Sequence, residues 1–467
     1  PRPKPRAVPP PPETGQDGTP PATPLPLHFK IADDLEVAQA LLFKLQGSTS
    51  APIVCDEGEI HRYTPKGIWE PVDAAALGRV IHTFRGATVG VKNEPFRVQT
   101  STIKAAISRA EDETKQKDFF AKAPIGLTFS DGFMRVCEDG LRFEAHSSDY
   151  RARIGYPFSY DECQNTTPTR WIDLLRKVFP ACVEIKGKRV FASVEEAEKD
   201  RDAKIALLQE FLGASLVGNA TRHHKCIVMV GTGLNGKGTV TKVVEGLFPD
   251  GSVCCVPPQD LSDKDALAGL AGKRLNLVSE LPTSEVMESD RFKQVVTGDT
   301  VTAREVYEKK KTFAPRAGHL YSTNGLPPVR DTSFGFWRRF IVLRFPYTFT
   351  EEEKITDYDK IILREESAAI VGWMLEGAAR LHKRDRYIVP RSSDYELEAW
   401  RKRANTVAMF VEDCTRPLDT EKGETAMIHG EKASILFDYY VKYCTRNNVS
   451  SMSVSYTHLT LPTSDLV

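Results

Sequence analysis

The sequence predicts an α/β fold with a parallel sheet near the middle of the chain. Three short apolar runs, Cys226–Val230, Leu275–Glu280 and Gly318–Asn324, have the length and composition of buried parallel strands. The first run is followed by a glycine-rich stretch and then by a valine- and leucine-containing segment with helical spacing. A mixed α+β region should precede this sheet, and a helical region should follow it.

Composition and charge are those of an ordinary globular chain. The 467 residues are 41% hydrophobic and 27% charged, enough for roughly three domains. Because 63 basic side chains balance 63 acidic ones, a strongly basic, histone-like protein is excluded. A local basic patch that contacts nucleic acid is still possible. No run reaches the roughly 18 apolar residues of a membrane span, so no membrane partner is expected. Nine cysteines without a C-x-x-C pair indicate reduced thiols rather than disulfides or a zinc site.

Both ends of the chain differ from its middle. Eleven of the 30 prolines fall within residues 1–26, which predicts a linker to an upstream domain or, equally, a disordered tail. Residues 454–463 back-translate to a string resembling the adapter of transposase-based sequencing libraries. We therefore expect 454–467 to be adapter-derived and the natural sequence to stop near Ser453, with a natural Thr-rich tail as the alternative.

The half before Gly231 contains no catalytic cluster and is predicted to be structural or regulatory. Residues 27–130 alternate short apolar and polar runs, with an aromatic cluster at Tyr63 and Trp69, and suggest no function. Residues 131–213 should form a mixed region. It contains a strand at 141–145 and helices at 171–179 and 205–216.

The segment after the first apolar run is predicted to be a P-loop. Strand, glycine loop and helix follow one another there, which is the context that this motif requires. The glycines let backbone N–H groups and the helix N-terminus face phosphate oxygens, and Lys237 supplies a cation to the β/γ-phosphates. Gly238 stands where Ser or Thr commonly binds magnesium, so Thr239 is the candidate substitute. The predicted nucleotide-binding residues are Gly231, Thr232, Gly233, Leu234, Asn235, Gly236, Lys237, Gly238 and Thr239.

Polar residues end the other two predicted strands. Glu280 ends a strand expected to neighbour the P-loop strand, where a carboxylate can hold Mg²⁺ through water and orient an attacking water. Asn324 could hydrogen-bond the γ-phosphate or that water. Taken singly, Glu280 could be a solvated strand end and Asn324 a turn residue.

Two arginines precede a fourth apolar run, residues 340–343. Arg338 or Arg339 would suit an arginine finger, which stabilises charge on the transferred phosphoryl group. The alternative is an arginine pair that anchors a strand edge.

The order and spacing of these residues resemble those of superfamily 3 helicases. Lys237 and Glu280 are 43 residues apart, and Glu280 and Asn324 are 44 apart, which is compact for a helicase. Further segments resemble the phage/plasmid primase-helicase family, which includes poxvirus and virophage relatives. They are Gly272–Leu275, Phe292–Asp299, Thr302–Tyr307 and Thr332–Arg339.

The resemblance implies an AAA+-like P-loop core and a DNA-gripping β-hairpin at residues 301–313. Its candidate DNA-binding residues are Arg304, Lys309, Lys310 and Lys311. Three adjacent lysines suit a row of phosphates, although such a run is often only a solvated turn. The aromatic-rich segment 434–443 resembles the first helix of the family's winged-helix domain, with an ordinary packing helix as the alternative.

These observations predict the domain order. It is a linker at 1–26, a region of unknown role at 27–130, a helicase-associated domain at 131–213, the ATPase/helicase domain at 214–350, a helical region at 351–400, a truncated winged-helix-like domain at 401–453 and the tail at 454–467.

The sequence therefore predicts an ATP-dependent DNA helicase. By resemblance it would be a hexamer that uses ATP and Mg²⁺, with Thr239 and Glu280 as magnesium ligands, on single-stranded or forked DNA. It would act in the host cytoplasm on a phage, plasmid or integrated element, beside a primase domain or partner. Two alternatives stay open: an ATP-dependent initiator or loader that unwinds little, and a P-loop NTPase that does not act on DNA.

Overall fold

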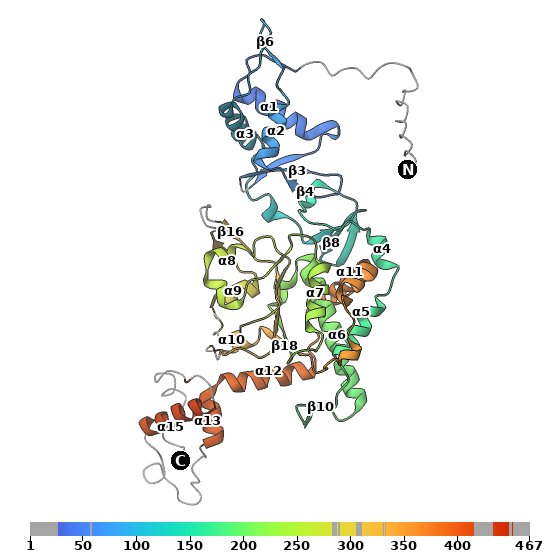
Figure 1. Cartoon of the computed structure of the whole chain (residues 1–467), viewed down its shortest axis with the longest axis vertical. Helices are drawn as coiled ribbons and strands as arrows, with labels where there is room; N and C mark the ends of the chain where they lie inside the picture. The colour runs from blue at the N-terminus through green and yellow to red at the C-terminus, as the bar shows by residue number, and fades with distance from the viewer. Residues whose placement is uncertain are drawn as a thin grey trace, which may run out of the picture. The chain divides into compact units, whose positions relative to one another are not determined.

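The computed structural model describes residues 27–56, 58–282, 287, 290–304, 311–329, 331, 333–414, 433–447 and 451 (Figure 1). The Pro-rich segment 1–26, Lys309, Lys310 and the tail 454–467 lie outside these residues, so the predictions about them stay predictions. The chain divides into two compact units, Pro1–Thr64 with Trp69–Phe119, and Pro65–Ile68 with Phe120–Val467.

The first unit packs three helices against short strands. The helices are α1 (Asp34–Gln46), α2 (Ala74–His82) and α3 (Thr100–Thr114). One antiparallel sheet has the order β2 (Ile53–Asp56), β3 (Glu59–Tyr63), β4 (Trp69–Pro71), and the other has the order β1 (His28–Phe29), β5 (Thr88–Val89), β6 (Glu94–Pro95), with β1 and β5 parallel. The predicted aromatic cluster is confirmed, because the rings of Tyr63 and Trp69 are 5.5 Å apart.

The second unit begins with a mixed region. It contains an antiparallel sheet of β7 (Gly126–Thr128), β8 (Phe133–Cys137) and β9 (Gly140–Glu144), the hairpin of β10 (Glu184–Ile185) and β11 (Lys188–Arg189), and the helices α4 (Tyr160–Gln164), α5 (Thr169–Val178) and α6 (Val194–Val217). The predicted strand at 141–145 and the helix at 171–179 are confirmed. Helix α6 begins earlier than predicted, because Ser193 caps it by accepting from the N–H of Glu196 at 3.2 Å.

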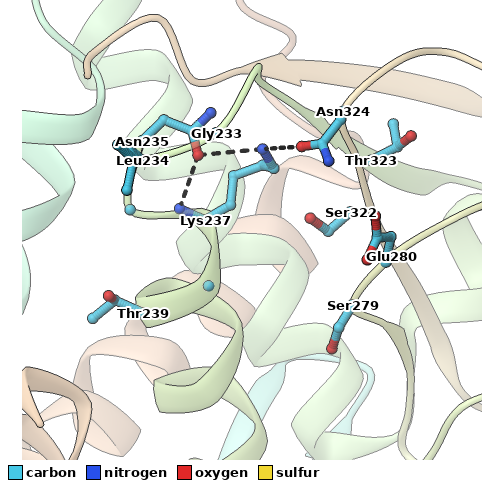
Figure 2. Close-up of a pocket in the computed structure, with 12 residues that line it drawn as sticks. Gly233, Leu234, Asn235, Lys237, Thr239, Ser279, Glu280, Ser322, Thr323 and Asn324 are labelled. Atoms are coloured by element: carbon cyan, nitrogen blue, oxygen red, sulfur yellow. Dashed lines mark hydrogen bonds between the residues drawn. The ribbon is translucent and has the colours of Figure 1, made fainter. Parts of the chain in front are cut away.

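A five-stranded parallel sheet forms the centre of this unit. Its order is β13 (Val253–Cys254), β14 (Leu275–Val278), β17 (Gly318–Thr323), β12 (Cys226–Val230), β18 (Phe340–Arg344). The expectation that the Glu280 strand neighbours the glycine-loop strand is wrong, because β17 lies between β14 and β12. Residues that follow the strand ends, such as Glu280 and Asn324, still gather at one edge (Figure 2).

Short helices and a hairpin surround the sheet. The helices are α7 (Lys237–Leu247), α8 (Lys264–Ala268), α9 (Asp290–Thr297) and α10 (Phe334–Trp337). Strands β15 (Val301–Ala303) and β16 (Lys311–Phe313) pair antiparallel, with Ala303 opposite Lys311. The two paired strands of the hairpin expected at residues 301–313 are therefore confirmed, and residues 305–310 between them lie outside the described residues.

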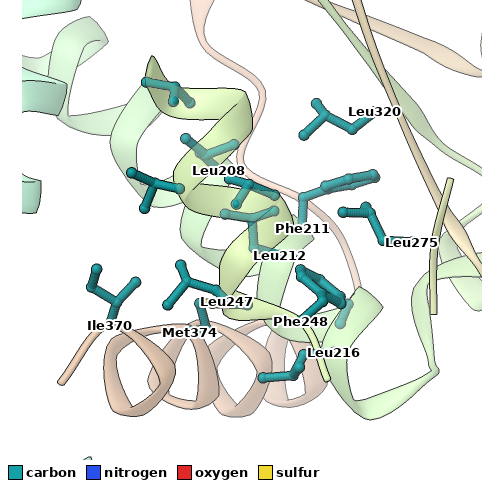
Figure 3. Packing of buried hydrophobic residues seen from close by; sticks show 14 of the residues in the cluster. Leu208, Phe211, Leu212, Leu216, Leu247, Phe248, Leu275, Leu320, Ile370 and Met374 are labelled. Carbon is teal, nitrogen blue, oxygen red and sulfur yellow. The ribbon is translucent and has the colours of Figure 1, made fainter. Parts of the chain in front are cut away.

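One face of the sheet is covered by α6, which packs in turn on α11 (Tyr358–Arg384) (Figure 3). Phe211 of α6 lies near Leu275 and Leu320 of the sheet, and all three are buried. A Cβ on Gly213 would meet the carbonyl O of Met374 and approach the backbone N of Ala378 to 2.8 Å, so the two helices touch backbone to backbone.

The last described elements are helices α12 (Arg391–Ala404), α13 (Thr406–Cys414) and α15 (Ala433–Arg446), which confirms the helix predicted at 434–443. Phe410 of α13 and Tyr440 of α15 are buried against each other with ring centroids 5.8 Å apart. Among the described residues, no helix has both the length and the apolarity required to cross a membrane.

Candidate functional site

The loop between β12 and α7 is curled by residues with positive φ. Gly233 has φ 110°, Leu234 has φ 46° and Gly236 has φ 79°. Two of the three are glycines, which adopt such angles without a steric penalty. The curl directs the start of α7 toward the edge of the sheet, and the N–H of Lys237, its first residue, donates to Oδ1 of Asn235 at 3.4 Å.

Lys237 is the first residue of α7, and its side chain is only 6% exposed. Its Nζ donates to the carbonyl O of Gly231, to Oδ1 of Asn235 at 3.2 Å and to Oδ1 of Asn324 at 3.3 Å. Burial lowers the pKa of Lys237, and the nearby charge of Glu280 opposes this effect. Every acceptor that contacts the ammonium within the described part of the chain is neutral, so its charge has no paired anion.

An open cavity of about 380 Å³ lies in front of this ammonium (Figure 2). The glycine loop lines this cavity together with Glu280 and Asn324. Glu280 lies two residues beyond β14, and Asn324 directly follows β17. Ser279, Ser322 and Thr323 also line the cavity and were not predicted as site residues. Their position beside Glu280 and Asn324 at two strand ends is the signal that could have identified them.

Hydrogen bonds between loops fix the cavity wall. The backbone N–H of Gly231 donates to the carbonyl O of Thr323 at 3.3 Å, and the N–H of Leu281 donates to the carbonyl O of Ser322 at 2.7 Å. These bonds tie the segments after β12, β14 and β17 to one another. Lys237, Glu280 and Asn324 are therefore held on a rigid edge rather than on independent loops.

The donor set of this cavity fits a polyphosphate. The Nδ2 of Asn235 is buried and has no hydrogen-bond partner among the described residues, so it is a spare donor beside Lys237. A buried donor without a partner costs roughly 1–3 kcal/mol, which an anionic oxygen would recover. An ammonium that contacts only neutral acceptors among the described residues, a spare amide donor and a helix N-terminus together favour phosphate oxygens.

The two predicted magnesium ligands, Thr239 and Glu280, line the same cavity. In Figure 2, Thr239 and Glu280 lie on opposite sides of the start of α7. No cluster of three His, Cys, Asp or Glu side chains that could hold a metal occurs in the described ranges. Mg²⁺ commonly binds through one or two carboxylates together with phosphate oxygens and water, and Glu280 alone can satisfy that need.

The two arginines predicted as candidate arginine fingers lie at the end of the sheet opposite the cavity, where β12 and β18 begin. They precede β18, and the N–H of Cys226, at the start of β12, donates to the carbonyl O of Arg339 at 2.8 Å. A strand length, roughly 15 Å, therefore separates them from the cavity of the same chain. Arg338 is exposed, whereas Arg339 is 7% exposed and donates to the carbonyl O of Gly335. Burial, and then the charge of Arg338, lowers the pKa of Arg339.

The hairpin places some of the predicted DNA-binding residues. Arg304 follows β15, is exposed, and its backbone N–H donates to the carbonyl O of Lys264 at 3.3 Å. Lys311 begins β16, and Lys309 and Lys310 lie outside the described residues. Their contact with DNA stays a prediction.

Comparisons with known proteins found one family model and several similar proteins, and the family model covers the residues of this cavity. A model described as a family of unknown function, DUF5906, matches residues 229–339. A protein of Acanthamoeba polyphaga mimivirus named "Putative helicase L207/L206" is 28% identical over 138 residues. That match covers 28% of this chain and only 14% of the mimiviral protein.

Two solved structures of the apo C-terminal region of NrS-1 are also similar. Each aligns with a TM-score of 0.46, at 13% and 12% sequence identity. The alignments cover 80% and 82% of this chain, and 75% and 80% of the other chains.

Proposed function

We propose that this chain is the motor part of an ATP-dependent DNA helicase of the superfamily 3 type, with an AAA+-like P-loop core. The observation that carries the proposal is the Lys237 ammonium, which is buried at the wall of an open cavity and contacts only neutral acceptors in the described structure. A buried charge without a counter-ion is costly unless a ligand supplies one. The triphosphate of ATP supplies that charge.

Each cavity residue then has a role. Lys237 and the backbone N–H groups at the start of α7 bind the β- and γ-phosphates, and Asn235 donates its spare amide hydrogen to a phosphate oxygen. Glu280 accepts a proton from the attacking water and orients it, while Asn324 positions the γ-phosphate. Mg²⁺, when bound beside Glu280, neutralises charge on the phosphate oxygens.

The remote arginines suit a ring in which ATP lies between subunits. Arg338 and Arg339 lie a full strand length from the cavity of their own chain, so they would act on the nucleotide of a neighbour. A guanidinium there stabilises the charge that develops during phosphoryl transfer. A head-to-tail contact of this kind, repeated at every interface, can close a ring, and we propose a homo-hexamer as in the superfamily 3 helicases that the sequence resembles.

DNA would be held by the hairpin of β15 and β16. Arg304 and Lys309–Lys311 would contact the phosphates of single-stranded or forked DNA, and ATP hydrolysis would move the hairpin along the strand. The partial similarity to a mimiviral protein named as a helicase supports this role over that of a P-loop enzyme on small molecules. The helicase would act in the host cytoplasm on a phage, plasmid or integrated element, beside a primase domain or partner.

ATP turnover with and without single-stranded DNA tests the proposal. The variants are Lys237→Ala and, as a matched control, Lys242→Ala, because Lys242 is an exposed lysine of the same helix α7. We expect DNA to stimulate turnover in the parent and in Lys242→Ala, and Lys237→Ala to abolish it. ATP turnover that single-stranded DNA does not change would refute a DNA motor. Equal turnover in Lys237→Ala and Lys242→Ala would refute the assignment of Lys237 to the ATP site.

A further inference from the structure

A second cavity, of about 270 Å³, adjoins the other side of the glycine loop. It shares Leu234, Gly236 and Thr239 with the first cavity. The rest of its wall comes from α5, from the segment after β18 and from the start of α11. This cavity therefore continues the candidate phosphate site on the side away from Glu280.

The wall of this second cavity is mainly apolar, and part of it is unusually exposed. Its apolar side chains are Leu174, Leu234, Phe349, Ile355 and Tyr358. Leu234 is 59% exposed and Ile355 is 56% exposed, although both border a hollow. Exposed aliphatic and aromatic groups around a concavity beside polar loops are typical of a ligand pocket.

Phe349 is fixed against the glycine loop itself. Its backbone N–H donates to the carbonyl O of Leu234 at 2.7 Å. A Cβ added to Gly236 would come within 3.0 Å of the Phe349 ring and within 2.7 Å of Cγ1 of Val178, so the ring packs directly on the loop. A group attached to a phosphate bound at Lys237 would therefore lie next to the loop on which this ring packs.

The polar groups around the pocket already bind one another. Lys177 Nζ lies 2.8 Å from Oε1 of Glu353, and the Tyr347 hydroxyl donates to the same oxygen at 2.6 Å. The other oxygen of Glu353 accepts from the N–H of Thr350 at 3.0 Å. Lys177 Nζ also lies 5.2 Å from the centroid of the Phe349 ring, so it is held over that ring.

The two remaining charged groups in the wall offer little selectivity. Lys354 Nζ binds both oxygens of Glu351, at 2.9 and 3.0 Å. Asp173 is exposed, so water competes for its carboxylate. Within the described residues, the pocket therefore presents ring and aliphatic surfaces, without a buried polar group to read the edge of a ligand.

We propose that this pocket takes the nucleobase of the bound nucleoside triphosphate, with Phe349 as its stacking partner, and that it discriminates weakly among bases. The inference rests on the proposed function, because the phosphates must first bind at Lys237. Apolar pockets distinguish similar ligands by roughly 10- to 200-fold, whereas sites that hydrogen-bond a ligand reject an unmatched one by roughly 10⁴-fold or more. A purine gains more ring contact than a pyrimidine, so a modest purine preference is expected.

Binding of ATP and of inorganic tripolyphosphate to the full chain tests the inference. Tripolyphosphate has the phosphates but no base, so it isolates the Lys237 site. The variants are Phe349→Ala and Ile355→Ser. The Ile355 side chain is exposed, so its replacement should not affect folding. Phe43→Ala is the matched control, because Phe43 is a 73% exposed phenylalanine of the first unit.

We expect Phe349→Ala to weaken the binding of ATP about tenfold, which is within the range measured for base stacking, and to leave the binding of tripolyphosphate unchanged. Ile355→Ser should act in the same direction, and ATP, GTP, CTP and UTP should bind the parent within about tenfold of one another. The inference would be overturned if Phe349→Ala weakened the binding of ATP and of tripolyphosphate equally, or changed neither. It would also be overturned if the parent preferred one base by more than roughly 100-fold. If the parent binds neither ligand, the proposed function fails and this inference fails with it.

Discussion

Substituting alanine for single glycines of the loop between β12 and α7 separates backbone strain from steric contact. Gly236 has φ 79°, and a Cβ there would come within 2.7 Å of Val178 Cγ1 and 3.0 Å of the Phe349 ring. Gly233 has φ 110°, but a Cβ there would meet no atom within 4 Å. Gly238 lies in α7 with an ordinary φ, and a Cβ there would also meet open space.

The expected changes in the free energy of unfolding follow from these differences. A non-glycine residue at positive φ costs about 1–2 kcal/mol, and crowding a packed contact costs about 1–3 kcal/mol more. Gly236→Ala should therefore lose about 2–5 kcal/mol, and Gly233→Ala about 1–2 kcal/mol. Gly238→Ala should gain about 0.5–1 kcal/mol, because alanine lowers the entropy of the unfolded chain and favours a helix.

Urea unfolding followed by tryptophan fluorescence measures these changes. Four of the five tryptophans, Trp171, Trp337, Trp373 and Trp400, belong to the second unit, so the signal mainly reports the unit that contains the loop. Gly236→Ala and Gly233→Ala with equal stability would refute the assigned contact with Val178 and Phe349. A destabilised Gly238→Ala would refute the open position at the start of α7.

Three further predictions concern the supports of the site. Buried Glu366 of α11 accepts from the N–H groups of Arg170 and Trp171 at 2.9 and 3.0 Å, so Glu366→Gln should cost about 1–3 kcal/mol in urea unfolding. The matched control Glu365→Gln, at an exposed position, should cost less. Lys177, and then Tyr347, lowers the pKa of Glu353 to about 2 from an ordinary 4.5. The contribution of this contact should be complete above pH 4.5 and lost as the pH falls toward 2, and an NMR titration of Glu353 with a midpoint near 4.5 would contradict it. Replacing Lys309–Lys311 with alanine should leave basal ATP turnover intact and reduce the salt dependence of DNA binding, and unchanged DNA binding would count against the hairpin contact.

Much of the fold of the second unit could be predicted from local patterns. Apolar runs with β-branched residues identify β12, β14 and β17, because strands buried on both faces carry no alternation. Helical spacing identifies α5 and α11 in the same way. Helical spacing does not predict the N-terminal part of α6, because residues 195–202 are mostly charged and show no apolar stripe.

The spatial arrangement was harder to predict, because strand order and edge are not local properties. Glu280 and Asn324 do line one cavity with Lys237, as their positions at strand ends suggested. Strand β17 nonetheless separates the Glu280 strand from β12, and Arg338 and Arg339 lie at the far edge. The pocket around Phe349 was missed altogether. Its wall combines segments from residues 173 to 358, and no spacing in the sequence links them.

Strand displacement on a forked DNA duplex tests the central claim most directly. We expect the parent chain with ATP to release the displaced strand, the Lys242→Ala control to match it, and Lys237→Ala to release none. ATP turnover stimulated by DNA without any strand release would contradict a helicase and favour a protein that loads onto DNA.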